Sequence, residues 1–138
     1  MRVAAGIIFV SCAGVLAGCG TSSSDQVRAK VNQFVTAAAN RQYATICTQV
    51  LAPSLVARLE EAGVSCQQAM QIAFGSVQNP TISIGRVTVS GNRASVLTLS
   101  SAKGQNASLD AIDLIKTAKG WRLSSLASPL TVGGTRHS

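Results

Sequence analysis

"TISIGRVTVSGNRASVLTLSS", residues 81–101, is the stretch of sequence that decides the fold. It is rich in β-branched residues, and the pair Gly91-Asn92 between its two halves is typical of a two-residue hairpin turn. We therefore predict two antiparallel strands in which Ser90 lies opposite Arg93.

The apolar residues of this hairpin change face part of the way along both strands. In the predicted register, Ile84 lies opposite Leu99. One face of the ribbon then carries Val87, Val89, Ala94 and Val96, and the other carries Ile82, Ile84, Leu97 and Leu99. Because a flat ribbon cannot bury both sets, we expect a strong bend or a β-bulge near Gly85.

A second hairpin follows in "ASLDAIDLIKTAKGWRLSSL", residues 107–126. It is predicted to turn through Ala118-Lys119-Gly120, a three-residue loop with Gly in the left-handed position. This register places Ile115 opposite Leu123, with Trp121 on the same face. The two hairpins together predict a four-stranded antiparallel sheet.

Four helices are predicted before the sheet. Apolar side chains recur at helical spacing, while capping residues, Pro and Gly mark the ends. The predicted helices run over residues 25–40, capped by Ser23 with Gln26, over 43–51, from Pro53 to the stop at Gly63, and from the cap Ser65 to Gly75.

The composition describes one packed domain with a diffuse positive charge. The 138 residues are 46% hydrophobic, 12% charged and 4% aromatic, with a formal net charge of +7. No stretch clusters four or more Lys or Arg, and aromatic residues that could stack on bases are scarce. We therefore expect no nucleic-acid partner.

The first residues have the pattern of an export signal. Met1-Arg2 is followed by "VAAGIIFVSCAGVLA", an apolar run of the length of a signal-peptide core and too short to span a bilayer comfortably. Residues 16–19, Leu-Ala-Gly-Cys, resemble the lipobox of bacterial lipoproteins. The resemblance implies cleavage between Gly18 and Cys19 and lipid on the Cys19 sulfur. The alternative is an ordinary secretory signal.

Such a lipid anchor would hold the protein at the cell membrane on the extracytoplasmic side, because several acyl chains together bind a bilayer firmly. Cys12 leaves with the signal and Cys19 takes the lipid. Cys47 and Cys66 then remain as an even pair in an oxidising compartment, and we expect a disulfide between them. The alternative, a redox or metal pair, lacks a CxxC motif, and His137 is the chain's single His.

The order of elements resembles a known fold family. "FVTAAANRQYATICTQVLAPSL" (34–55), then Cys66, then hairpins ending in "KGWRL" (119–123), is similar to the nuclear-transport-factor-2-like (NTF2-like) or cystatin-like α+β cone, and in particular to small actinobacterial envelope lipoproteins. The resemblance implies helices packed on the concave face of a curved four-stranded antiparallel sheet. The expected organisation is a signal peptide over 1–18, lipidated Cys and tether over 19–24, α+β domain over 25–127 and flexible tail over 128–138.

Enzymes of that family, of the ketosteroid-isomerase and polyketide-cyclase types, use an Asp base inside the cone. The candidates here are Asp110, Asp113 and Tyr43, but the two Asp are three residues apart in a strand and must point to opposite faces. His137 lies in the tail, so neither a Ser-His-Asp set nor a metal site is expected.

We therefore predict a non-catalytic interaction domain without cofactor or metal. Its predicted partners are the membrane, through Cys19, and either an envelope protein or a small apolar ligand. Two alternatives stay open: a carrier of a small apolar ligand in the cone, and an isomerase- or cyclase-like enzyme. A pocket in the cone, where one is open, would be lined by Phe34, Tyr43, Trp121 and Asp113, but we expect Trp121 and Tyr43 to belong to the core.

Overall fold

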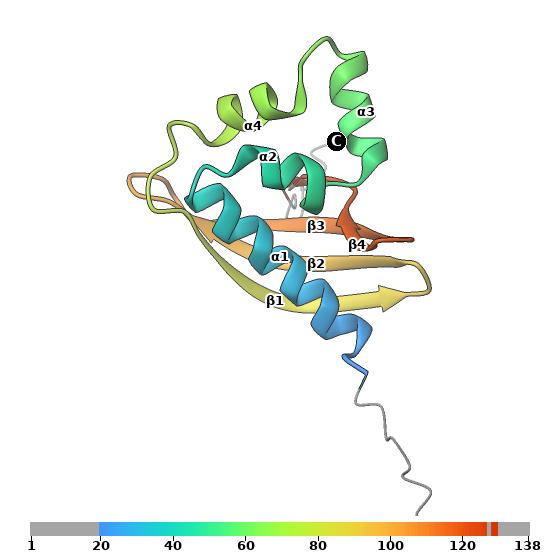
Figure 1. The fold of residues 1–138 in the computed structure, drawn as a ribbon. Coiled ribbons are helices and arrows are strands. Elements are labelled where there is room, and N and C mark those ends of the chain that lie inside the picture. The colour runs from blue at the N-terminus through green and yellow to red at the C-terminus, as the bar shows by residue number, and fades with distance from the viewer. Residues whose placement is uncertain (1–19, 127, 130–138) are drawn as a thin grey trace, which may run out of the picture.

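A computed structural model describes residues 20–126 and 128–129 (Figure 1). The helices are α1 (Ser23–Ala39), α2 (Tyr43–Thr45), the π-helical turn η1 (Ile46–Val50), α3 (Pro53–Glu61) and α4 (Cys66–Phe74). The strands are β1 (Thr81–Ser90), β2 (Arg93–Ser101), β3 (Ser108–Thr117), β4 (Gly120–Leu123) and β5 (Ser128–Pro129). The predicted signal peptide, the cleavage site at Gly18 and the lipid site at Cys19 lie outside the described residues.

Three of the predicted helices are present as the α-helices α1, α3 and α4, and side-chain caps mark the starts of α1 and α4. The hydroxyl of Ser65 accepts the backbone N–H of Gln68 at the start of α4, as predicted. At α1 the cap is Ser22 rather than Ser23. The Ser22 hydroxyl accepts the N–H of Asp25 at 3.1 Å and donates to its carboxylate at 2.6 Å, so the acidic residue moves the start by one position.

The second predicted helix is not a regular α-helix. One α-turn, α2, passes into η1, whose wider π turn buries Ile46 and Val50 completely. Directly after η1, the backbone N–H of Ala52 donates to the Leu123 carbonyl at 2.8 Å. This bond ties the helical layer to the edge of the sheet.

The predicted disulfide is present between Cys47 in η1 and Cys66 at the start of α4, with the two Cα atoms 5.9 Å apart. Cys66 is buried and Cys47 is half-buried. The bridge therefore fastens α4 to η1, which is itself held against the sheet edge.

The sheet is antiparallel in the order β1-β2-β3-β4, as the two hairpins predicted. It also contains β5, which pairs with β3 so that Pro129 lies opposite Asp110 and Ser128 opposite Ala111. These two residues fall in the expected tail, and the lack of sequence periodicity did not reveal their backbone pairing.

The first hairpin contains the expected bulge, and the bulge corrects the predicted register. Ser90 pairs with Arg93 as predicted, but Ile84 pairs with Thr98 and not with Leu99. The ladder shifts between Ile84 and Val87, so that two residues of β1 lie opposite one of β2.

The bulge also corrects the predicted faces. The extra residue in β1 reverses the direction of the side chains that follow it. The apolar side chains on both sides of the bulge therefore pack against the core: Ile82, Ile84, Val87 and Val89. On β2, Ala94 and Val96 face the core while Leu99 is 49% exposed on the other side. Figure 1 shows the resulting curvature of β1 around α1.

The turn of the second hairpin is one residue shorter than predicted. Leu114, not Ile115, lies opposite Leu123, and Thr117 pairs with Gly120. The Thr117 hydroxyl donates to the Gly120 carbonyl at 2.9 Å and accepts the Lys119 N–H at 3.2 Å, which closes a two-residue turn. Gly120 has φ +97°, the left-handed conformation expected for it.

The interior lies between α1 and the concave face of the sheet (Figure 1). Val27 and Val31 are 0% exposed and Phe34 is 4% exposed, so one face of α1 is fully covered. The sheet residues buried in the same cluster are Ala94, Val96, Ile112, Leu114, Trp121 and Leu123. Side chains of the protein itself thus occupy the space between helix and sheet.

We expect the double variant Cys47→Ala/Cys66→Ala to fold with lower stability. Removing a bridge that closes a loop of this length costs about 3 kcal/mol in the chain-entropy account. Urea unfolding of both proteins measures the difference in free energy. An unchanged unfolding midpoint would contradict the stabilising role of the bridge.

Candidate functional site

Two candidate residues for a pocket in the cone, Phe34 and Trp121, belong to the core. The Phe34 ring packs edge-on against that of Phe74 in α4, with ring centres 5.6 Å apart. Trp121 is 2% exposed, and its indole N–H has no hydrogen-bond partner among the described residues. Tyr43 is half-buried, and its hydroxyl likewise lacks a partner there. These aromatic side chains pack within the core or against it, and so they fill the interior of the cone.

The structure places Asp113 on the outer face of the sheet. Its side chain is exposed, and the Ser125 hydroxyl donates to it at 3.4 Å. It lines a hollow of about 530 Å³ together with Arg58 and Ser125, and neither Phe34 nor Trp121 lines that hollow. Asp113 therefore does not share a pocket with Phe34 and Trp121, contrary to the expectation from sequence.

Asp110 is the inward carboxylate, and the two Asp do point to opposite faces as predicted. Asp110 is 7% exposed. The Ser100 hydroxyl donates to one carboxylate oxygen at 2.7 Å and the Ser108 hydroxyl to the other at 2.9 Å. The bond from Ser100 joins β3 to β2, and the two hydrogen bonds together fix the position of the carboxylate.

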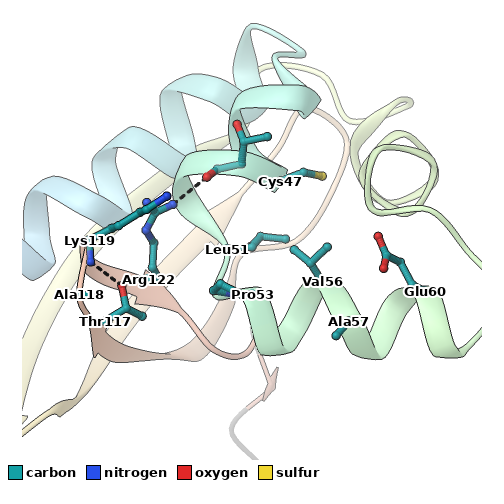
Figure 2. Close-up of a pocket in the computed structure, with 11 residues that line it drawn as sticks. Cys47, Leu51, Pro53, Val56, Ala57, Glu60, Thr117, Ala118, Lys119 and Arg122 are labelled. Carbon is teal, nitrogen blue, oxygen red and sulfur yellow. Dashed lines mark hydrogen bonds between the residues drawn. The ribbon is translucent and has the colours of Figure 1, made fainter.

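A groove of about 480 Å³ lies outside the cone, between the η1–α3 segment and the β3–β4 turn (Figure 2). Its floor is apolar and comes mainly from Leu51, Pro53, Val56 and Ala57. Its sides are formed by Cys47 and Thr48 of η1 and by Thr117 and Ala118 of the turn. One face of α3 contributes Pro53, Val56, Ala57 and Glu60 to the groove. Their helical spacing could have identified this face from the sequence.

The two ends of the groove carry opposite charge. Figure 2 shows Glu60 at one end and Lys119 with Arg122 at the other. The Arg122 guanidinium donates to the Thr48 carbonyl at 3.0 Å, which fixes its position. An apolar strip with a cationic end can hold an elongated apolar group that carries an anion. The groove could not be predicted from the sequence as a whole, because its walls come from segments that lie far apart along the chain.

Nothing in the described part of the chain forms a metal centre: no three His, Cys, Asp or Glu residues gather there. Within residues 20–126 and 128–129, no helix is both long and apolar enough to cross a bilayer.

Comparison with known proteins shows the fold. No protein-family model matches the sequence, and no curated protein sequence matches it. A solved structure from Streptomyces avermitilis, named as a candidate dehydratase of the NTF2-like family, matches with a TM-score of 0.55 at 18% sequence identity. The match covers 79% of this chain and 96% of that chain. The domain therefore has the NTF2-like α+β fold, which includes both enzymes and non-enzymes.

We expect Asp110→Ala to lower the free energy of unfolding by about 2 kcal/mol, because two hydroxyl groups lose a charged acceptor. The matched variant Asp113→Ala, on the outer face, should change stability by less than about 0.5 kcal/mol. Urea unfolding of both variants tests the difference. Equal effects would contradict the structural role given to Asp110.

Proposed function

We propose that this protein is an extracytoplasmic lipoprotein, held at the cell membrane by lipid on Cys19, whose NTF2-like domain binds a partner without catalysing a reaction. The lipobox-like residues 16–19 support the anchor. α1 begins at Ser23, only four residues after Cys19, so the domain would stay close to the bilayer.

The filled interior is the observation that carries the binding role. Val27, Val31 and Ile112, from the helix and the sheet, are each at most 1% exposed. A ligand inside the cone would have to displace such side chains, which are costly to expose. The outer groove, in contrast, offers apolar surface at Pro53, Val56 and Ala57 without rearrangement.

An enzyme is the weaker alternative. The structural neighbour is named as a candidate dehydratase, and this chain does have one inward carboxylate, Asp110. Against catalysis, hydroxyl groups of Ser100 and Ser108 engage both oxygens of that carboxylate. A base must also lie within hydrogen-bond reach of the substrate's proton, and at 7% exposure Asp110 offers a substrate little access.

Substituting Cys19 tests the anchor. The wild-type protein should sediment with membranes, and its mature N-terminal peptide should carry the mass of a lipidated Cys19. Cys19→Ser should move the protein to the soluble fraction, because no acyl chain remains. Cys12→Ser, in the segment removed on cleavage, is the matched control and should not change sedimentation. An unmodified Cys19 in the wild type would overturn the anchor.

Site-specific crosslinking tests the groove. A photoreactive residue at Ala57, on the groove wall, should give one discrete adduct in intact membranes. The same residue at Ala107, exposed between β2 and β3, should give none. Val56→Asp should abolish the Ala57 adduct, because it places a charge on the apolar floor. A protein-sized adduct supports the interaction role, and a small apolar one the carrier alternative. Equal adducts at both positions would contradict a site here.

A further inference from the structure

We propose that three cationic residues form a binding site for the phosphate of an anionic phospholipid headgroup: Lys30 of α1, Lys119 of the β3–β4 turn and Arg122 of β4. We call these three residues the cation cluster. This inference deepens the proposed function and rests on its anchor at Cys19, because the anchor supplies the lipid surface.

The last turn of η1 holds two members of the cation cluster next to each other. The Lys30 amine donates to the Gln49 carbonyl at 3.1 Å and to the Gln33 side chain at 2.7 Å. The Arg122 guanidinium donates to the Thr48 carbonyl, one residue away. Burial, and secondarily the charge of Arg122, lower the pKa of Lys30 from its usual value. Two like charges are thus kept together by the fold.

Lys119 completes the cluster from the tip of the turn. It lines the groove together with Arg122, and it lines a neighbouring hollow of about 300 Å³ together with Lys30. None of the residues that line this hollow is acidic. In the groove the single acidic lining residue is Glu60, at the far end (Figure 2). Cations gathered without a carboxylate create a local potential that attracts an anion.

Donors are still available in this cluster. Lys119 is exposed, and its amine has no hydrogen bond among the described residues. Lys30 uses two donors of its ammonium group and keeps a third. Ammonium and guanidinium groups are the usual partners of phosphate, and these charge-assisted bonds are strong.

The position of the cluster favours a lipid as the source of the phosphate. Gln26 and Ala29, from the first turns of α1, line the same hollow as Lys30 and Lys119. The four residues from Cys19 to Ser23 span at most about 14 Å. Lys30 lies seven residues further on, about 10 Å along the helix axis. A lipid on Cys19 would therefore keep the cation cluster within reach of the headgroups.

The test uses the mature lipidated protein in nanodiscs of phosphatidylcholine alone, or of phosphatidylcholine and phosphatidylglycerol in equal parts. Rates of lysine acetylation are measured by peptide mass spectrometry. With phosphatidylglycerol, Lys119 should react about five-fold more slowly, because its amine is engaged. Lys103, exposed at the opposite end of the sheet in the β2–β3 loop, should react at the same rate in both discs.

Two variants test whether the protection of Lys119 depends on the cation cluster. Arg122→Gln should remove most of the Lys119 protection, since the phosphate loses its guanidinium partner. Lys119→Gln lies at an exposed turn and should leave the fold intact while reducing the protection of Lys30. Equal rates for Lys119 in the two discs would overturn the proposal. Protection by inorganic phosphate in phosphatidylcholine discs would also overturn it, and would indicate a site for free anions.

Slower acetylation of Lys119 in phosphatidylcholine discs than in detergent, with no further slowing by phosphatidylglycerol, would overturn the preference for an anionic lipid, because the phosphate bound would then belong to a zwitterionic headgroup. Failure of the anchor is distinguishable from all these results. In that case Cys19 carries no lipid mass, and the protein does not purify with the discs at all.

Discussion

Two residues of β1, Gly85 and Arg86, lie opposite a single residue of β2, Leu97, and this bulge is the constraint on which the fold depends. Without it, Ile82 and Ile84 would point away from the core. A Cβ on Gly85 would lie 3.2 Å from the Leu97 carbonyl oxygen, so a side chain at this position would require the Leu97 backbone to shift by a few tenths of an ångström. The bulge also binds the helix: the Arg28 guanidinium donates to the Gly85 carbonyl at 3.2 Å.

The curved sheet that results is closely fitted to α1. Phe34 and Trp121, which the sequence pattern suggested for a ligand pocket, instead complete the core. Binding surface is consequently found outside the cone, where η1, α3 and the β3–β4 turn meet. The same turn carries Lys119, so the apolar groove and the cation cluster share one edge of the domain.

Much of this fold could be predicted from local sequence, because turns and caps are local interactions. Gly91-Asn92, the Ser65 cap and the disulfide were all predictable, as was a bulge near Gly85. Small errors arose where one side chain decided a boundary. Asp25 moves the cap of α1 to Ser22, and the Thr117 hydroxyl shortens the second turn.

The groove and the cation cluster could not be predicted in this way. Their members come from α1, η1, α3 and the β3–β4 hairpin, which only the tertiary fold brings together. The strand β5 was missed for the same reason, since its two residues form a strand only by pairing with β3. For Asp110 and Asp113, alternation separated the two faces but did not say which face was inward.

The central claim is that the protein's own side chains fill the cone. Its most direct test is the free energy of unfolding of Phe34→Ala, measured by urea denaturation with Leu99→Ala, at an exposed position, as the control. A filled core predicts a loss of about 3–5 kcal/mol for Phe34→Ala and little change for the control. A loss below about 1 kcal/mol for Phe34→Ala would contradict the account, because it would mean that the ring borders open space.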